Sequence, residues 1–179
     1  MVTGDPLDEV AEWDRDSLRD SGAMPTSRPP GWVVAVSLAA RGGAVWVPVA
    51  GVLAGVGQRR AAVRGLVAAG VALPLGHVLG TVLSRRRPPA ERLPARRALP
   101  ERPDSSSFPS KHAMTAAAFG TAVGVESPRA GLAVAPLVAV VAYSRVRTRV
   151  HWPSDVLGGL ALGAAVAWVV REVVHRRTP

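Results

Sequence analysis

The stretch SRVRTRVHWPSD, residues 144–155, says more about the fold and the chemistry than any other part of the chain. Five residues separate Arg145 from His151, and three separate His151 from Asp155. A guanidinium can bind two phosphate oxygens at once, and an imidazole can act as nucleophile, acid or base near neutral pH. A carboxylate beside the imidazole can fix its tautomer and stabilise its cation. The combination predicts phosphoryl-transfer chemistry.

A helix is expected to begin directly after this stretch's histidine and tryptophan. Pro153 suits the first helical position, where a backbone N–H has no intrahelical partner. Asp155 then falls in the first turn, where a negative charge is favourable. The apolar residues that follow, to about residue 170, predict a membrane-spanning helix.

The composition favours a membrane protein over a soluble domain. Of the 179 residues 48% are apolar and only 4% aromatic, and the apolar residues lie in long blocks of Ala, Val, Leu and Gly. A soluble domain would show amphipathic periodicity instead. The absence of cysteine excludes disulfides and thiolate chemistry. The net charge of +9 lies in short loops, which favours lipid headgroups over nucleic acid as a partner.

About five membrane spans are predicted, and together they make an all-α integral membrane helical bundle. Their approximate limits are 43–58, 65–84, 111–126, 129–144 and 153–170. An interfacial helix over 31–41 is expected to lead into the first span, although one long tilted span fits the pattern as well. Arginine-rich residues 58–64 are expected to form a turn, and residues 171–179 a polar tail.

The N-terminal region differs from the rest of the chain. Residues 1–30 form a polar, acidic tail. Leu7, Val10, Trp13 and Leu18 give it a weak helical stripe, which predicts a partly ordered segment or a short interfacial helix. We assign it no chemistry.

Three polar segments lie at the ends of predicted spans: SRRRPP at 84–89, SSSFPSKHA at 105–113, and the stretch at 144–155. The chain crosses the membrane twice between the second and third segments, and a loop joins the first to the second, so all three are expected on one face. Ser110 is a natural N-cap, and His112 falls in the first turn that follows. Free N–H groups at such a helix start can bind an anion, and His112 can protonate a leaving oxygen.

These residues resemble the signature of the type-2 phosphatidic acid phosphatases, the lipid phosphate phosphatase superfamily that includes vanadium haloperoxidases. The third part, S-R-x5-H-x3-D, is complete as Ser144, Arg145, His151 and Asp155. The second part, P-S-G-H, reads Pro109, Ser110, Lys111, His112, with lysine in place of glycine. Of the first part, K-x6-R-P, Arg87 and Pro88 are present and the lysine position falls on Gly80. The signature region, 80–170, would lie in a membrane-embedded phosphatase domain of residues 31–175.

The resemblance implies a role for each matching residue. His151 would be the nucleophile that forms a phosphohistidine, Asp155 would orient it, and His112 would protonate the leaving alcohol and later activate water. The expected phosphate-binding residues are Arg87, Arg145, Ser110 and the backbone N–H of Lys111. The family needs no metal or cofactor. The partners would be a lipid phosphate or diphosphate and the bilayer, with no nucleic acid.

Two departures from the pattern keep alternatives open. Gly80 cannot supply the first-part cation, and Arg85, Arg86 or Lys111 could replace it. A protein that binds anionic lipid headgroups without catalysis, or an enzyme like a vanadium haloperoxidase, would fit the same residues. Family resemblance favours an extracytoplasmic site, whereas the arginine count of the loops favours the cytoplasm.

Overall fold

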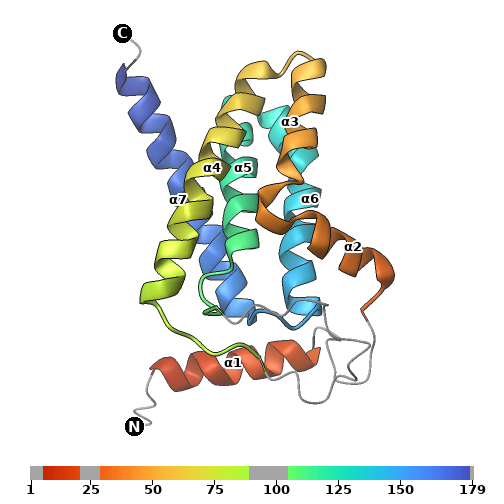
Figure 1. Cartoon of the computed structure of the whole chain (residues 1–179), viewed down its shortest axis with the longest axis vertical. Coiled ribbons are helices and arrows are strands. Elements are labelled where there is room, and N and C mark those ends of the chain that lie inside the picture. Colours follow the sequence, from red (N-terminus) through yellow and green to blue (C-terminus); the bar gives the residue numbers. More distant parts are fainter. Residues whose placement is uncertain (1–5, 21–28, 89–104, 178–179) are drawn as a thin grey trace.

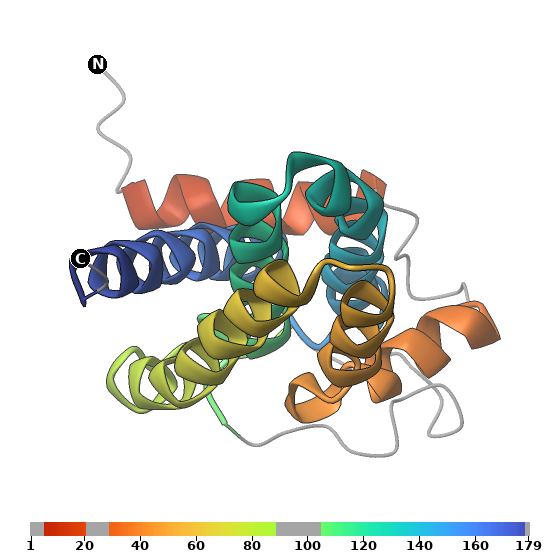
Figure 2. The same ribbon diagram turned by 90° about the horizontal axis from the view of Figure 1, so that it is seen from above.

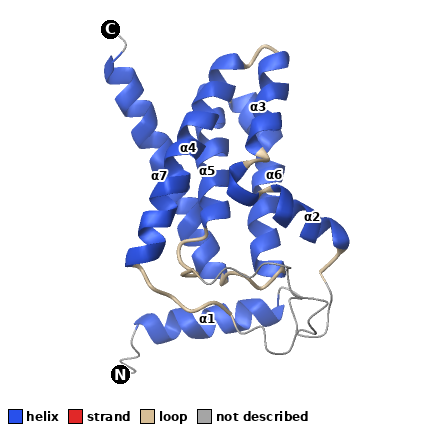
Figure 3. Ribbon diagram, in the orientation of Figure 1, coloured by secondary structure: helices blue, strands red, loops and turns tan. Residues whose placement is uncertain are grey.

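The computed structural model describes residues 6–20, 29–88 and 105–177, and Figure 3 shows only helices and loops in this part of the chain. Residues 89–104, whose arginines contribute to the loop count used above for the membrane face, lie outside it. In chain order the elements are α1 (Pro6–Asp20), α2 (Gly31–Ala39), η1 (Arg41–Gly43), α3 (Trp46–Gly55), α4 (Arg59–Val82), α5 (Lys111–Glu126), α6 (Pro128–Arg147) and α7 (Pro153–Arg177).

Helices α3 to α7 run side by side, and α1 lies across one end of the bundle (Figure 1). Seen from above, α5 occupies the centre, with α4, α6 and α7 around it (Figure 2). Most of α5 is therefore buried, from Ala113 to Phe119 without interruption. Its Phe119 ring stacks on the Trp46 ring of α3 with centroids 4.9 Å apart. The bundle thus holds the start of α5 in a fixed place at the end covered by α1.

Small residues allow α7 to approach α5 closely. A Cβ atom added at Gly159 would come within 2.6 Å of the Ser110 carbonyl oxygen, and one added at Gly163 would collide with the backbone at Met114. Close backbone approach through glycines is common among membrane helices. By contrast, Gly51 and Gly55 are also four residues apart, yet a Cβ added at either meets nothing within 4 Å. Two small residues at this spacing therefore do not by themselves identify a helix contact.

The predicted membrane bundle is confirmed as an all-helical fold in the described residues. Three helices, α4, α6 and α7, are long and apolar enough to cross a membrane, and the bent pair α2–α3 would make a fourth span. At 16 residues, α5 is shorter than a usual span, and its place in the centre is what makes it the fifth member. Exposed valines along α4 form the kind of apolar face that lipid covers: Val63, Val67, Val71 and Val78.

Several predicted boundaries are wrong. Residues 59–64 are not a turn, because α4 already begins at Arg59, with Arg59 and Arg60 exposed. The last helix does not stop near residue 170 but continues to Arg177. Before the first span the chain bends by 57° between α2 and the segment Arg41–Gly55, where Gly42 has a φ of 60°. One straight span over this region is therefore excluded.

The N-terminal region contains the helix α1, but its buried face differs from the predicted stripe. Leu18 is buried, whereas Val10 and Trp13 are 41% and 47% exposed. Asp14 takes the inward position and is 1% exposed.

Candidate active site

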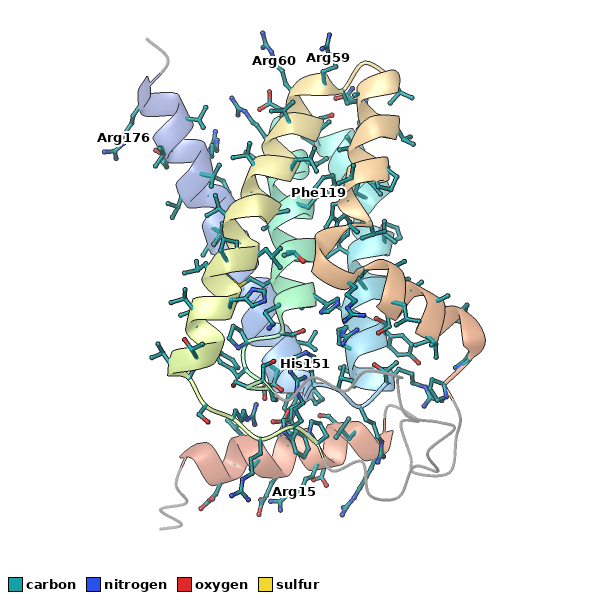
Figure 4. All side chains as sticks on the ribbon, in the orientation of Figure 1. Arg15, Arg59, Arg60, Phe119, His151 and Arg176 are labelled. Atoms are coloured by element: carbon teal, nitrogen blue, oxygen red, sulfur yellow. The ribbon has the colours of Figure 1, made fainter. Side chains whose placement is uncertain are left out.

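The three polar segments meet at one end of the bundle, as the span topology predicts. Figure 4 shows His151 at the end that faces α1, and Arg59 at the opposite end. The segments are also joined through their backbones, since the Ser110 N–H donates a hydrogen bond of 3.1 Å to the Asp155 carbonyl. Helix α7 begins at Pro153 and α5 at Lys111, which confirms both predicted helix starts.

His151 is held in one tautomer by its two neighbours. The ring is 3% exposed. Its Nδ1 lies 2.6 Å from the Ser107 carbonyl oxygen, and its Nε2 lies 3.4 Å from Nη1 of Arg87. A carbonyl oxygen only accepts and a guanidinium only donates, so Nδ1 carries the proton and Nε2 presents its lone pair. Nε2 is therefore the ring nitrogen that is able to act as a nucleophile, and it lies next to Nη1 of Arg87.

The surroundings of His151 also keep the ring neutral. Burial lowers the pKa of His151 to about 4; Asp155 opposes this shift, whereas the charges of Arg145 and Arg87 add to it. Oδ2 of Asp155 is 3.8 Å from Nδ1, which is an ion-pair distance. The Ser107 carbonyl therefore orients the ring, and the Asp155 charge is placed to stabilise the ring whenever it is cationic. The sequence offered no sign of the Ser107 carbonyl.

Asp155 is fully buried and well supplied with donors. Its Oδ1 accepts a 2.6 Å hydrogen bond from Nη1 of Arg85, and its Oδ2 accepts from the Trp152 N–H at 2.9 Å and from the Ser107 hydroxyl. The bond from Trp152 caps the start of α7, as a carboxylate three residues into a helix often does. A buried carboxylate with these partners remains charged and fixed in place.

The guanidinium of Arg87 is positioned by backbone carbonyl groups. Its Nε donates to Ser105 (3.0 Å), its Nη2 to Ser106 (3.0 Å) and its Nη1 to Val150 (2.6 Å). These carbonyls belong to the second and third polar segments, so Arg87 joins all three segments and keeps Nη1 beside the nucleophilic Nε2.

Two predicted phosphate-binding residues have buried polar atoms without a partner. In the described part of the chain, three buried side-chain nitrogen or oxygen atoms lack a hydrogen bond, and two of them are Oγ of Ser110 and Nε of Arg145. Arg145 is 4% exposed, and its Nη1 donates to the hydroxyl and carbonyl of Ser37 in α2. Leaving a buried polar atom unpaired costs about 1–3 kcal/mol. An anion bound between these two groups would remove that cost.

His112 and Lys111 form the first turn of α5, as predicted. The Ser110 hydroxyl at the N-cap does not bond to this turn, which differs from the expected cap. The stem of Lys111 lies over α4, because a Cβ at Gly76 would be 3.1 Å from its Cγ. Gly80 faces the same loop as the site, since a Cβ there would be 4.0 Å from the Phe108 carbonyl.

Asp14 of α1 belongs to this end of the bundle, which corrects the assignment of no chemistry to residues 1–30. Its carboxylate accepts hydrogen bonds from the Ser154 N–H (2.9 Å), the Ser154 hydroxyl (2.7 Å) and Nη2 of Arg85 (2.6 Å). Arg85 in turn contacts Asp155. Burial lowers the pKa of Arg85, but the hydrogen bonds to Asp14 and Asp155 outweigh it, so the net pKa is raised. Arg85 is thus committed to two carboxylates.

The described residues do not form a cluster of metal ligands. Across residues 6–20, 29–88 and 105–177, no three His, Cys, Asp or Glu side chains converge to hold a metal ion. The groups brought together instead are two arginines, two histidines, a serine and the start of α5, which suit a tetrahedral oxyanion.

Known proteins are similar to this chain in sequence. An undecaprenyl-diphosphatase of Sulfolobus acidocaldarius is 31% identical over 131 residues, 72% of this chain and 63% of that protein. A decaprenylphosphoryl-5-phosphoribose phosphatase of Mycobacterium tuberculosis is 45% identical over 75 residues, 40% of this chain and 39% of that protein. The chain thus spans less than two thirds of the length of either relative.

Solved structures share the fold. A PAP2 type phosphatidylglycerolphosphate phosphatase from Bacillus subtilis superposes with a TM-score of 0.70 at 22% identity, over 94% of this chain and 87% of that one. Aquifex aeolicus LpxE superposes with a TM-score of 0.66 at 21% identity, over 88% and 93%. The family described as the PAP2 superfamily matches residues 61–179. With its three polar segments gathered around His151, the chain belongs to the PAP2 superfamily.

Proposed function

We propose that this protein is an integral membrane phosphatase that hydrolyses a lipid phosphate or diphosphate through a phosphohistidine, without a metal. The observation that carries the proposal is that two predicted phosphate-binding residues have unpartnered buried atoms, Nε of Arg145 and Oγ of Ser110, while Nε2 of His151 presents a lone pair. A phosphoryl group placed there meets a nucleophile, the free N–H groups at the start of α5 and two guanidinium groups.

In the first step Nε2 of His151 attacks phosphorus, and the bond from phosphorus to the leaving oxygen breaks. The leaving oxygen lies opposite the nucleophile in an in-line displacement, and His112 donates the proton that it needs. Arg87 and Arg145 hold the equatorial oxygens, whose charge is spread in the transition state. The His151 ring becomes cationic while it carries the phosphoryl group, and Asp155 stabilises that charge.

In the second step water replaces the histidine on phosphorus. Neutral His112, having given its proton to the leaving group, accepts a proton from the attacking water. The bond from phosphorus to Nε2 breaks, phosphate leaves, and His151 returns to its Nδ1–H tautomer. The proton count closes, because the proton donated in the first step is recovered in the second.

The expected substrate is a phosphorylated lipid because the site lies at the ends of helices with exposed apolar faces. The undecaprenyl-diphosphatase and the decaprenylphosphoryl-5-phosphoribose phosphatase among its relatives support a polyprenyl chain as the lipid. We also propose that the site faces the extracytoplasmic side, as the family resemblance implies.

A phosphate-release panel tests the proposal. Purified protein in detergent is offered phosphatidate, a polyprenyl monophosphate and a polyprenyl diphosphate, and free phosphate is measured for the native protein and for His151→Ala. We expect release from at least one lipid and loss of that release in the variant. Lipid binding without release would favour the headgroup-binding alternative, and vanadate-dependent bromination would favour a haloperoxidase.

A further inference from the structure

A cavity of about 350 Å³ opens between η1, α4 and α5, directly beside the catalytic end of α5. Its described lining consists of Ala40, Arg41, Gly42, Gly43, Leu73, His77, Lys111, His112 and Thr115. His112 is the residue that this cavity shares with the proposed catalytic site. The cavity is large enough for a phosphate and the first atoms of a lipid chain.

The position of His112 shows which part of a substrate the cavity would receive. Under the proposed mechanism His151 attacks phosphorus from one side, and the leaving oxygen lies on the opposite side, next to His112. Whatever is attached to the leaving oxygen must then extend past His112. His112 forms part of the cavity wall, so the leaving group enters the cavity.

The charge of the lining indicates what the leaving group carries. Arg41 and Lys111 are cations, and no carboxylate is among the lining residues. The stem of Lys111 packs over Gly76 of α4, and the residue lines the cavity. Nδ1 of His77 lies 2.9 Å from the Leu73 carbonyl and carries the proton, so Nε2 can only accept and the two cations are the groups that suit an anion.

We propose that this cavity is a second anion subsite, formed by the cations Arg41 and Lys111, that binds a phosphate within the leaving group. The inference rests on the proposed function and narrows its substrate class to lipids whose leaving group is itself anionic, such as a polyprenyl diphosphate. His151 bonds to the terminal phosphorus, and the bond from that phosphorus to the bridging oxygen breaks. The bridging oxygen leaves as part of the lipid monophosphate, whose negative charge the subsite stabilises.

The test compares two substrates that differ only in the second phosphate. Polyprenyl monophosphate and polyprenyl diphosphate of one chain length are assayed with the native protein, Arg41→Gln and Arg41→Lys. Because a hydrogen bond to a charged group is worth about a 10- to 100-fold effect, Arg41→Gln should lower kcat/KM for the diphosphate by that factor. The monophosphate should change by less than about threefold, and Arg41→Lys should recover most of the loss. Arg59→Gln, at the far end of the bundle, is the matched control.

A binding measurement keeps the subsite testable even if no lipid is hydrolysed. Methylenediphosphonate and methylphosphonate are titrated into His151→Ala and into the double variant His151→Ala/Arg41→Gln by calorimetry. We expect the diphosphonate to bind at least about tenfold more tightly to the single variant, and the double variant to lose that preference. Equal affinity for the two ligands, or an equal effect of Arg41→Gln on both lipids, would overturn the subsite. If no lipid is hydrolysed but methylenediphosphonate still binds more tightly than methylphosphonate, the result counts against the proposed function and not against the subsite.

Discussion

The contact between α1 and the catalytic end of the bundle leads to a prediction about Asp14. Asp14→Asn keeps the size of the side chain and removes its charge. Oδ1 of the new amide can still accept from the Ser154 N–H, which is 2.9 Å away. The amide NH2 would face Nη2 of Arg85, now 2.6 Å from Oδ2, and two donors cannot bond to each other.

The size of the effect follows from burial. A hydrogen bond to a charged group contributes about 1.5–3 kcal/mol. Asp14 is 1% exposed but the Arg85 side chain is 30% exposed, so water can partly replace the lost partner and the lower end of that range applies. Arg85 then loses one of the two carboxylates that fix it against Asp155. We expect kcat to fall about tenfold, equivalent to about 1.4 kcal/mol in the activation barrier, with KM changed by less than about twofold.

The assay is steady-state hydrolysis of the best lipid of the panel, together with thermal unfolding in detergent. Asp16→Asn is the matched control: it lies on the same helix, is 66% exposed and pairs with Arg19 at 3.2 Å. Such a surface pair is worth about 0–1 kcal/mol, so neither kcat nor Tm should change. If Asp14→Asn behaved like Asp16→Asn, or raised KM with kcat intact, Asp14 would not be a positioning residue.

Further predictions concern the phosphate, the nucleophile, the packing and the topology. Arg145→Lys should lower kcat/KM about 100-fold, because lysine cannot supply the Nε donor of a guanidinium fork, and the test is the phosphate-release assay with an unchanged melting curve. In nitrogen NMR His151 should remain a neutral Nδ1–H ring at about pH 5.5, where an ordinary histidine is mostly protonated. Because the pKa of His151 is lowered to about 4, the ring should become charged only near that lower pH. A titration midpoint near 6.5 would contradict this prediction. Gly163→Val should lower the Tm by separating α7 from α5, and an unchanged Tm would rule out the contact. The chain has no cysteine, so each introduced cysteine is the single thiol. In intact cells Ser105→Cys should react with an impermeant thiol reagent and Arg59→Cys should not. The reverse result would place the site on the cytoplasmic face.

The arrangement of the catalytic end could be predicted from the sequence because it depends on the order and number of crossings. Two crossings between His112 and His151 return the chain to the same face, whatever the length of each helix. Pro153 and Ser110 fixed two helix starts through local backbone chemistry. The ends of α4 and α7 were mispredicted because exposed arginines such as Arg59, Arg60 and Arg176 were read as turn and tail, although arginine is a good helix former.

The contacts that depend on distant partners could not be predicted. Asp14 and Arg85 are 71 positions apart, and a carboxylate in an acidic helix is ordinarily expected to face solvent. The Ser107 carbonyl beside His151 and the Ser37 hydroxyl beside Arg145 are likewise set by packing. For Asp14 the one available signal was its spacing of four residues from Leu18, which places both on one helix face.

The most direct test of the central claim is to trap the phosphorylated enzyme. The protein is mixed with a lipid labelled with radioactive phosphorus in its terminal phosphate and is quenched in alkali, where a phosphohistidine is stable. We predict a label that is lost in acid and maps to the peptide containing His151, is absent in His151→Ala, and accumulates in His112→Asn if hydrolysis slows more than transfer. Steady phosphate release from the native protein with no label on His151 would contradict the mechanism, as would a label that survives in His151→Ala.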